Sequence, residues 1–246
     1  MIDLTPRQTD ILKKIIQEYT EAGEPVGSEI LDKKYNLGVC PATVRNEMVE
    51  LAKKGYLKKS HFSSGRIPTA DAFRFYIKNL MEEKELSTAE EVSTKSDIWD
   101  YRNELHRLLQ NSTRLLAKRT NMLAVSSTNL GDIYYYGINN FLRQREFWDL
   151  DIACDFLERL DETSFFKEIL DEFKRLENEI IFFLGEKDLK DNTLENCATV
   201  FGEFEGQSLK GIIGVMGPKR MHYDVVIPNV KYLTGLIESM VIEQGL

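Results

Sequence analysis

Two short helical patterns joined by a glycine-containing turn constrain the fold of this chain more than any other feature. The first pattern covers residues 28–35 and begins at Ser28, a residue type that caps helices. A connection of about four residues, NLGV at positions 36–39, leads to Pro41, which opens a second helix that Gly55 ends. Short helices connected in this way predict a helix-turn-helix unit. The inward-facing residues of the first helix are expected to be Ile30, Leu31 and Tyr35.

A longer helix precedes this unit. Thr5 is a suitable N-cap, Pro6 fits the first helical position and Gln8 completes a capping box. Gly23 follows the pattern and is expected to end the helix. The apolar residues at helical spacing, which predict its buried stripe, are Ile11, Leu12, Ile15, Ile16 and Tyr19.

The helix that Pro41 opens has a polar front edge suited to reading bases. Its predicted buried stripe is Val44, Met48 and Leu51. Its opposite face carries Ala42, Asn46, Val49, Glu50 and Lys53, with Thr43 and Arg45 on the flanks. Asn pairs bidentately with adenine and Arg with guanine in the major groove, and recognition helices use their N-terminal residues. Asn46 is therefore the predicted base reader, while Arg45 is expected to reach either a base or a phosphate.

A basic hairpin is expected directly after this helix. The segment YLKKSHFSSGRIP, residues 56–68, predicts two short strands around SSG. The candidate phosphate contacts are Lys53, Lys54, Lys58, Lys59, Arg66 and, at the hairpin tip, His61. Ser63, Ser64 and Gly65 allow either a close approach of the backbone to phosphate or a turn that contacts nothing. A helix, a helix-turn-helix and a basic hairpin together predict a DNA-binding winged helix.

The charge of the chain is divided unevenly. Residues 1–80 contain 13 Lys and Arg against 10 Asp and Glu, a net charge of +3. The remaining residues contain 32 − 13 = 19 against 40 − 10 = 30, a net charge of −11. A basic region gains affinity for phosphate through counterion release, whereas an acidic body is repelled by it. The total of −8 therefore does not exclude DNA binding by the N-terminal part.

After the hairpin the sequence predicts a helix over residues 69–86 and a polar linker over residues 87–97. An amphipathic, heptad-like helix follows from Ile98 to Met122. Its seam positions are Ile98, Tyr101, Leu105, Leu108, Ser112, Leu115, Arg119 and Met122. We expect this helix and the one after the hairpin to contribute to a dimer interface.

The last part of the chain mixes strands and helices and predicts an α+β domain with a mostly antiparallel sheet. Strands are expected at residues 122–128, 133–137, 179–185, 197–206 and 210–218, and helices at 148–160, 164–176 and 223–242, the last interrupted near Pro228. The predicted organisation is a winged helix at 1–80, a linker and amphipathic helix at 81–120, and the α+β domain at 121–246.

The sequence favours a protein that is not an enzyme and needs no metal or cofactor. Its three cysteines are far apart, and His61, His106 and His222 share no motif with a cysteine or carboxylate. The segment GIIGVMG has neither the dinucleotide-binding nor the P-loop spacing. No apolar run approaches the roughly 18 residues of a membrane span, and the first residues lack a signal-peptide pattern, so we expect a cytoplasmic protein.

Several stretches resemble the heat-inducible transcription repressors of bacteria, the HrcA family. These stretches are LTPRQTDILKKIIQEYTEAGEPVGSEIL, NLGVCPATVRNEM, SSGRIPTADAFRFYI, GINNFLRQREFWDLD, LGEKD and GIIGVMGPKRMHYDVVIPNVKYL. Together they place the resemblance over residues 1–81 and 133–240. Thr43, Val44, Arg45 and Asn46 match the recognition helix of the family, and the wing is matched by Ser64, Gly65, Arg66 and Ile67.

The resemblance implies a homodimeric repressor that binds an inverted repeat, the CIRCE element, ahead of chaperonin and heat-shock operons. It also implies a GAF-like C-terminal domain and the chaperonin GroE as the partner that keeps the repressor active. Cys40 stands where the family usually has Ser, and His222 where it usually has Asp. The chain is also shorter than is common in the family.

Two other functions remain open. One is a regulator whose C-terminal domain senses a small molecule. The other is an interaction module that keeps a winged helix without binding DNA. No polar cluster in the C-terminal sequence designates a ligand site, and that domain is expected to be structural.

Overall fold

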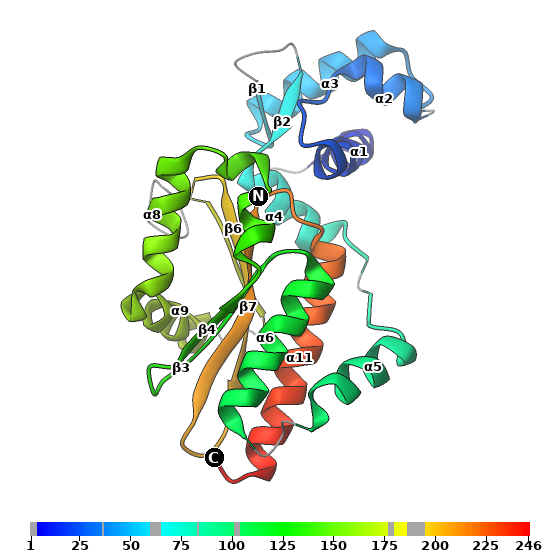
Figure 1. Cartoon of the computed structure of the whole chain (residues 1–246). Helices are drawn as coiled ribbons and strands as arrows, with labels where there is room; N and C mark the ends of the chain where they lie inside the picture. The colour runs from blue at the N-terminus through cyan, green and yellow to red at the C-terminus, as the bar shows by residue number, and fades with distance from the viewer. Residues whose placement is uncertain are drawn as a thin grey trace. The chain divides into compact units, whose positions relative to one another are not determined.

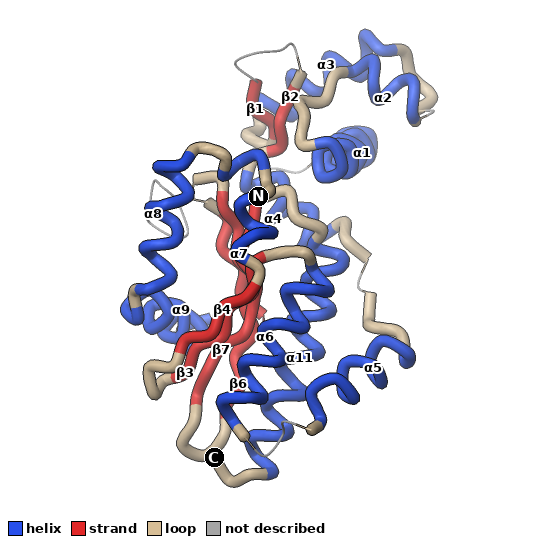
Figure 2. Tube along the Cα trace, viewed as in Figure 1, coloured by secondary structure: helices blue, strands red, loops and turns tan. Residues whose placement is uncertain are grey.

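The computed structural model describes residues 4–35, 37–59, 65–82, 84–100, 104–176, 180–185 and 195–246. The chain divides into two compact units, Met1–Glu82 and Glu83–Leu246, whose elements are shown in Figure 1 and Figure 2. The sequence placed the first division at residue 80. The N-terminal unit contains helices and a two-stranded hairpin, and the C-terminal unit contains a five-stranded sheet.

The N-terminal unit has the predicted order of a helix, a helix-turn-helix and a hairpin. Its elements are α1 (Pro6–Ala22), α2 (Ser28–Lys34), α3 (Pro41–Lys53), β1 (Leu57–Lys59), β2 (Arg66–Pro68) and α4 (Ala70–Asn79). Its core includes Ile11, Leu12, Ile15, Ile16, Leu31, Val44, Leu51 and Phe73. The predicted start of α1 is confirmed, because Thr5 and Gln8 form both halves of a capping box. Gly23 ends α1 in the left-handed conformation, with φ of 67°.

Three details of the helix predictions are wrong. Ser28 does not cap α2 but is its first residue, and Gly27 occupies the N-cap. Ile30 does not face the core, since its side chain is 42% exposed, and Leu31 alone of α2 is fully buried. The helix after the hairpin, α4, begins as expected after its N-cap Thr69 but ends at Asn79, not at residue 86.

The hairpin is tied back to the loop between α1 and α2. Strands β1 and β2 pair antiparallel, with Lys58 opposite Ile67 and Lys59 opposite Arg66. The backbone of Arg66 also exchanges two hydrogen bonds of 2.9 Å with that of Val26, which extends the hairpin by a bridge. The base of the hairpin is therefore fixed to the helical part of the unit.

The predicted linker and heptad-like helix are corrected by the structure. The polar segment forms α5 (Thr88–Trp99), which starts with a capping box between Ser87 and Glu90. A separate helix, α6 (Leu105–Thr120), follows. The buried residues of α6 are Leu108, Leu109, Ser112, Thr113, Leu116, Ala117 and Thr120. This face packs on the sheet and on the last helix, so it is not a free coiled-coil seam.

The sheet of the C-terminal unit confirms the predicted antiparallel α+β architecture, which agrees with a GAF-like domain. Its strands are β3 (Leu123–Thr128), β4 (Ile133–Tyr136), β5 (Ile180–Leu184), β6 (Cys197–Glu205) and β7 (Lys210–Pro218). Their order is β4-β3-β7-β6-β5, and every neighbouring pair is antiparallel. All five strands lie where the sequence placed them.

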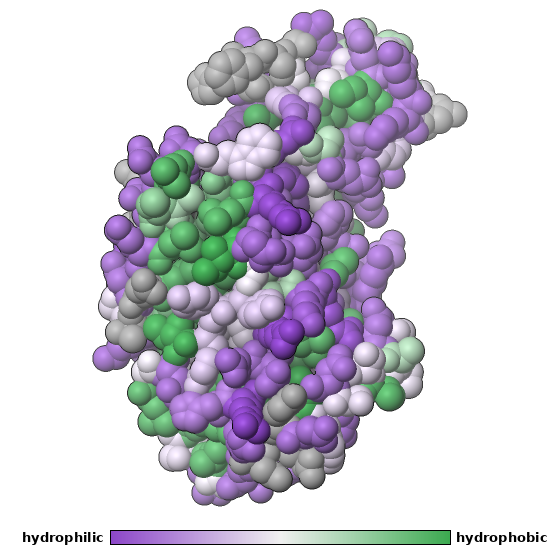
Figure 3. All heavy atoms as spheres, viewed as in Figure 1, coloured by the Kyte–Doolittle hydropathy of each residue, from purple (hydrophilic) through white to green (hydrophobic). Residues whose placement is uncertain are grey.

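Helices cover both faces of this sheet (Figure 1). One face is covered by α6 and α11 (Tyr223–Glu243). The other is covered by α7 (Ile138–Leu142), the 3-10 turn η1 (Arg145–Phe147), α8 (Leu150–Asp161) and α9 (Thr163–Leu176). The core on this second side contains Phe141, Phe147, Phe156, Phe165, Phe166, Phe183 and Phe201. Figure 3 shows apolar side chains gathered beside α8 on the visible face of this unit. At the start of α8, Trp148 and Leu150 are 68% and 73% exposed.

Helix α11 is continuous, and the predicted interruption near Pro228 is wrong. Pro228 lies inside the helix, six residues from its start. By length and composition α11 could cross a membrane. In this fold it packs against β6, β7 and α6, as a core helix does.

The glycines of GIIGVMG lie within β7, where atoms of neighbouring strands and side chains come very close to the backbone. A Cβ on Gly214 would lie 2.1 Å from the carbonyl oxygen of Val200, and one on Gly217 would lie 2.6 Å from Sδ of Met122. These glycines are thus explained by sheet packing and not by a phosphate-binding loop.

Candidate nucleic-acid interface

Helix α3 separates a buried stripe from an exposed polar edge, as its sequence predicts. Val44, Met48 and Leu51 are buried. Arg45 and Asn46 lie next to Val44 in sequence but are exposed. Neither side chain forms a hydrogen bond or ion pair with another residue that the structure describes. Both side chains are therefore available for contacts with another molecule.

The start of α3 is set by Cys40 and Pro41. Cys40 is the N-cap residue but makes no capping hydrogen bond with its side chain, and Pro41 occupies the first turn. Sγ of Cys40 lies 3.3 Å from Oγ1 of Thr43, which is half-buried. Hydrogen bonding from the side chain and backbone of Thr43 lowers the pKa of the Cys40 thiol. Thr43 is thus engaged with the cap and is less accessible than Arg45 and Asn46.

A polar layer holds α3 against α1. Nε2 of Gln8 donates a 3.0 Å hydrogen bond to Oε2 of Glu47, and Arg7 lies 3.6 Å from the same carboxylate. Nζ of Lys54 donates a 2.8 Å hydrogen bond to Oε1 of Gln8. Lys54 was predicted to contact phosphate, but its ammonium group is turned towards α1. Because Gln8 also completes the capping box, one residue couples the start of α1 to the orientation of α3.

A buried carboxylate holds α2 against α1. Glu18 is buried and accepts hydrogen bonds of 2.7 Å from Nζ of Lys34 and from the hydroxyl of Tyr35. Burial raises the pKa of Glu18, but the two hydrogen bonds and the positive charge of Lys34 together outweigh burial, so the pKa is lowered. Burial and the carboxylate together raise the pKa of Tyr35 to about 12. No sequence pattern indicated this pairing, because a single Glu on a helix usually faces solvent.

The predicted cations around α3 have different surroundings. Lys53 is exposed and forms a 2.7 Å ion pair with Glu50 one turn earlier. Exposed ion pairs of this kind contribute little stability, so Lys53 can leave Glu50 and pair with another negatively charged group. Lys58 and Lys59 are exposed on β1. Successive residues of a strand point to opposite faces, so only one of these two lysines can face a given surface.

The predicted contacts in β2 are mostly structural. Arg66 is half-buried. Gly65 is fully buried, and a Cβ at this position would lie 2.8 Å from Cβ of Pro25 and 2.9 Å from its carbonyl oxygen. The glycine is explained by this close approach, and its backbone is buried rather than exposed for contact with phosphate. His61, Ser63 and Ser64 lie outside the described residues.

The GPKRMHY stretch, for which the sequence suggested no role, joins two parts of the C-terminal unit. Nε of Arg220 donates a 2.7 Å hydrogen bond to Oε1 of Glu146, and its terminal nitrogen bonds Oε2 of Glu146 at 3.2 Å and Oε1 of Gln144 at 3.1 Å. Both charged side chains are only 17% exposed. The pair fixes the turn before α11 to η1, so two stretches that carry the resemblance meet in space.

Comparison with known proteins identifies the family of the chain. The family model described as HrcA protein C terminal domain matches residues 43–227, which are 185 of the 246 residues. The chain belongs to the HrcA family. The match begins within α3 and ends within α11, and it includes the sheet of the C-terminal unit.

Relatives named heat-inducible transcription repressor HrcA match the chain over different lengths. The protein from Symbiobacterium thermophilum is 42% identical over 127 residues, which are 52% of this chain and 37% of the relative. The protein from Roseiflexus castenholzii is 43% identical over 116 residues, which are 47% of this chain and 32% of the relative. These alignments span about a third of the length of the two relatives. The protein from Ruminiclostridium cellulolyticum is 24% identical over 342 residues, with 98% of both chains covered.

A solved structure shares the fold of the HrcA chain. This crystal structure, of a hypothetical protein, gives a TM-score of 0.84 at 18% sequence identity and covers 98% of this chain and 100% of the other. At that identity the likeness concerns the fold alone. The 342 aligned residues of the Ruminiclostridium relative exceed the 246 of this chain, so that alignment contains segments that this HrcA protein lacks.

Proposed function

We propose that this HrcA protein is a DNA-binding transcriptional repressor of heat-shock and chaperonin genes. Its target is a double-stranded inverted repeat of the CIRCE type, and it binds this operator in the cytoplasm as a homodimer. The observation that supports the proposal best is the exposed edge of α3, where Arg45 and Asn46 lie free beside a fully buried Val44. Repression is steric, because the bound dimer occupies promoter DNA.

The geometry of the unit suits insertion of α3 into a major groove. The polar layer from Gln8 and the buried Glu18 fix the orientation of the helices of the unit, so Arg45 and Asn46 are held at a defined place. A rigidly oriented amide can pair bidentately with adenine, and a guanidinium with guanine. One of the two exposed lysines of β1 then contacts a phosphate beside the groove.

Two further parts of the proposal come from the family. A two-fold dimer presents two copies of α3 to successive major grooves, which matches an inverted repeat. The chaperonin GroE is proposed as the partner that keeps the repressor active, so that unfolded clients relieve repression by engaging the chaperonin.

Fluorescence anisotropy with a labelled inverted-repeat duplex and a scrambled duplex tests the proposal. We expect Asn46→Ala to weaken operator binding by about 1–3 kcal/mol, or roughly 5- to 150-fold, and to leave binding to the scrambled duplex nearly unchanged. The matched control is Asn111→Ala, the same chemical change at a half-buried position of α6 in the other unit.

The two duplexes separate base reading from general attraction to DNA. If Asn46→Ala weakened both duplexes equally, Asn46 would not read a base. If the unsubstituted protein did not prefer the inverted repeat over the scrambled duplex at any salt concentration, the proposed function would be wrong.

A further inference from the structure

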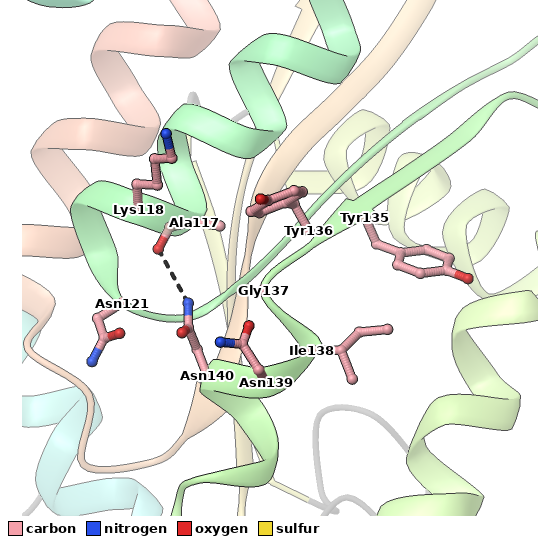
Figure 4. A pocket seen from close by; sticks show the side chains of 9 residues that line it. All are labelled: Ala117, Lys118, Asn121, Tyr135, Tyr136, Gly137, Ile138, Asn139 and Asn140. Carbon is pink, nitrogen blue, oxygen red and sulfur yellow. Dashed lines mark hydrogen bonds between the residues drawn. The ribbon is translucent and has the colours of Figure 1, made fainter.

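The C-terminal unit has an open cavity of about 590 Å³ on the side of the sheet covered by α6. It lies between the C-terminal end of α6, the end of β4 and the start of α7 (Figure 4). Ligand sites in proteins commonly have volumes of about 300–1,000 Å³. The cavity therefore has the size of a site for a small molecule, in a unit where the sequence designated none.

Polar side chains with unused hydrogen-bonding capacity surround this cavity. Lys118, Asn121 and Asn139 are exposed there, and their side chains form no hydrogen bond or ion pair with any residue that the structure describes. Asn140 is held in place, because its Nδ2 donates to the carbonyl oxygens of Ala117 at 3.4 Å and Met122 at 3.2 Å. Among the residues that the structure describes, none donates a hydrogen bond to its amide oxygen. Lys118 is the one charged residue of the lining, so the cavity favours an anionic group.

The backbone around the cavity is fixed in an uncommon conformation. Asn121 has a φ of 53° and is the one non-glycine residue with positive φ among the described residues. Gly137 has a φ of 95°, and a Cβ there would lie 2.5 Å from the carbonyl oxygen of Met122. Figure 4 shows the amide side chains of Asn121 and Asn139 on either side of Asn140. The site is thus largely formed without a ligand.

An aromatic ring completes the cavity. Tyr136 pairs with Ala124 in the sheet and lies on the face that α6 covers. Its side chain is exposed and points towards Lys118 in Figure 4. The guanidinium of Arg114 lies 5.6 Å from the centre of this ring and occupies one of its faces. Tyr136 is 44% exposed, so part of its ring is accessible for stacking with a planar ligand.

We propose that this cavity binds a mononucleotide. The Tyr136 ring stacks on the base, the amides of Asn121, Asn139 and Asn140 form hydrogen bonds with the base edge and sugar, and Lys118 contacts the phosphate. A base offers donors and acceptors side by side on its edge, which matches several amides better than a simple aromatic acid does. Lysine binds phosphate as a point charge. The site does not depend on whether the N-terminal unit binds DNA.

Isothermal titration calorimetry of the full chain tests this proposal with AMP, GMP, CMP and UMP as probes. We expect saturable binding of at least one nucleotide. Lys118→Gln is expected to weaken that binding about tenfold, as the loss of one charge-assisted hydrogen bond does. Tyr136→Leu is expected to weaken it to a similar degree through lost stacking. Lys95→Gln on α5 is the matched control, because Lys95 is exposed, carries the same charge and lies outside the cavity.

Inorganic phosphate, adenosine and benzoate serve as comparison ligands. The proposal requires the preferred nucleotide to bind more tightly than each of them. Equal affinity for inorganic phosphate would show that no base is recognised, and tighter binding of benzoate would identify the wrong class of ligand. Unchanged affinity in the Lys118→Gln protein, whose exposed substitution on α6 leaves the core intact, would place the ligand elsewhere. Absence of binding by all four nucleotides at millimolar concentration would refute the proposal.

Discussion

The two lysines of β1 give the sharpest test of how the hairpin meets DNA. Lys58 and Lys59 are neighbours on one strand and are both exposed, but their side chains leave opposite faces of the hairpin. One of them therefore faces the duplex in each subunit. Each phosphate contact contributes about 0.9 to the slope of log K against log salt concentration. For a dimer, loss of one contact per subunit should flatten this slope by about 2 × 0.9, or roughly 1.8.

The assay is operator anisotropy between 50 and 200 mM KCl with Lys58→Ala, Lys59→Ala and the double variant. Over this fourfold rise in salt concentration, a slope difference of about 1.8 changes the ratio of the two affinities, unsubstituted protein over variant, by about tenfold. The two affinities therefore lie closer together at the higher salt concentration. One single variant should reproduce the double variant, and the other should resemble the unsubstituted protein. Lys95→Ala on α5 controls for the change in net charge. Equal effects of the two single variants that add in the double variant would refute the argument from strand alternation.

Two further predictions concern stability and use chemical denaturation. Arg220→Met should lower the free energy of unfolding by about 2–3 kcal/mol, which is less than for a fully buried pair because Arg220 and Glu146 are each 17% exposed. The double variant that also carries Glu146→Leu should lose less stability than the sum of the two single variants. Simple additivity of the two losses would contradict the coupling. Glu18→Gln should be less stable than the unsubstituted protein by roughly 1–2 kcal/mol at pH 7. The pKa of Glu18 is lowered in the folded state, so its contribution is present above the unfolded-state pKa and is lost as the pH falls through the folded pKa. The difference should therefore shrink below about pH 4, and a difference that grew with acidification would contradict this assignment.

Local signals predicted most of the candidate interface. The capping box at Thr5 and Gln8, the left-handed Gly23 and the buried stripe of α3 each depend on residues within one or two turns. Such signals are legible because neighbours in sequence satisfy the same backbone groups. The exposure of Arg45 and Asn46 follows from the same periodicity.

The errors arose where the partner of a residue lies far away in sequence. Lys54 was expected to face DNA, but Gln8, 46 residues earlier, accepts its hydrogen bond. Gly65 was expected at an exposed turn, but the chain at Pro25 lies against it. The buried Glu18 is explained by Lys34 and Tyr35 on the next helix. No pattern within a single helix indicates such contacts.

The polar segment before α6 illustrates a different difficulty. The series Ser87 to Glu90 is a capping box, yet its polar composition suggested a linker. The helix forms because α5 buries Thr94 and Ile98, and it contacts α6 and α11. In α6, the buried face differs from the expected heptad seam. This helix packs against both the sheet and a neighbouring helix, and together they cover a wider stripe of its surface than one coiled-coil partner would.

The corrected set of cations explains why the proposed repressor needs two subunits. Lys54 is hydrogen-bonded to Gln8 and Arg66 is half-buried, so the exposed cations of the described interface are Arg45, Lys53, Lys58 and Lys59, and only one of the two β1 lysines can face a given surface. Two or three phosphate contacts give weak binding at physiological salt, and the net charge of −11 beyond residue 80 opposes it further. A dimer doubles these contacts, and its second α3 binds at a high effective concentration once the first has bound. An inverted repeat therefore supplies the affinity, as well as the specificity, that one copy of this unit lacks.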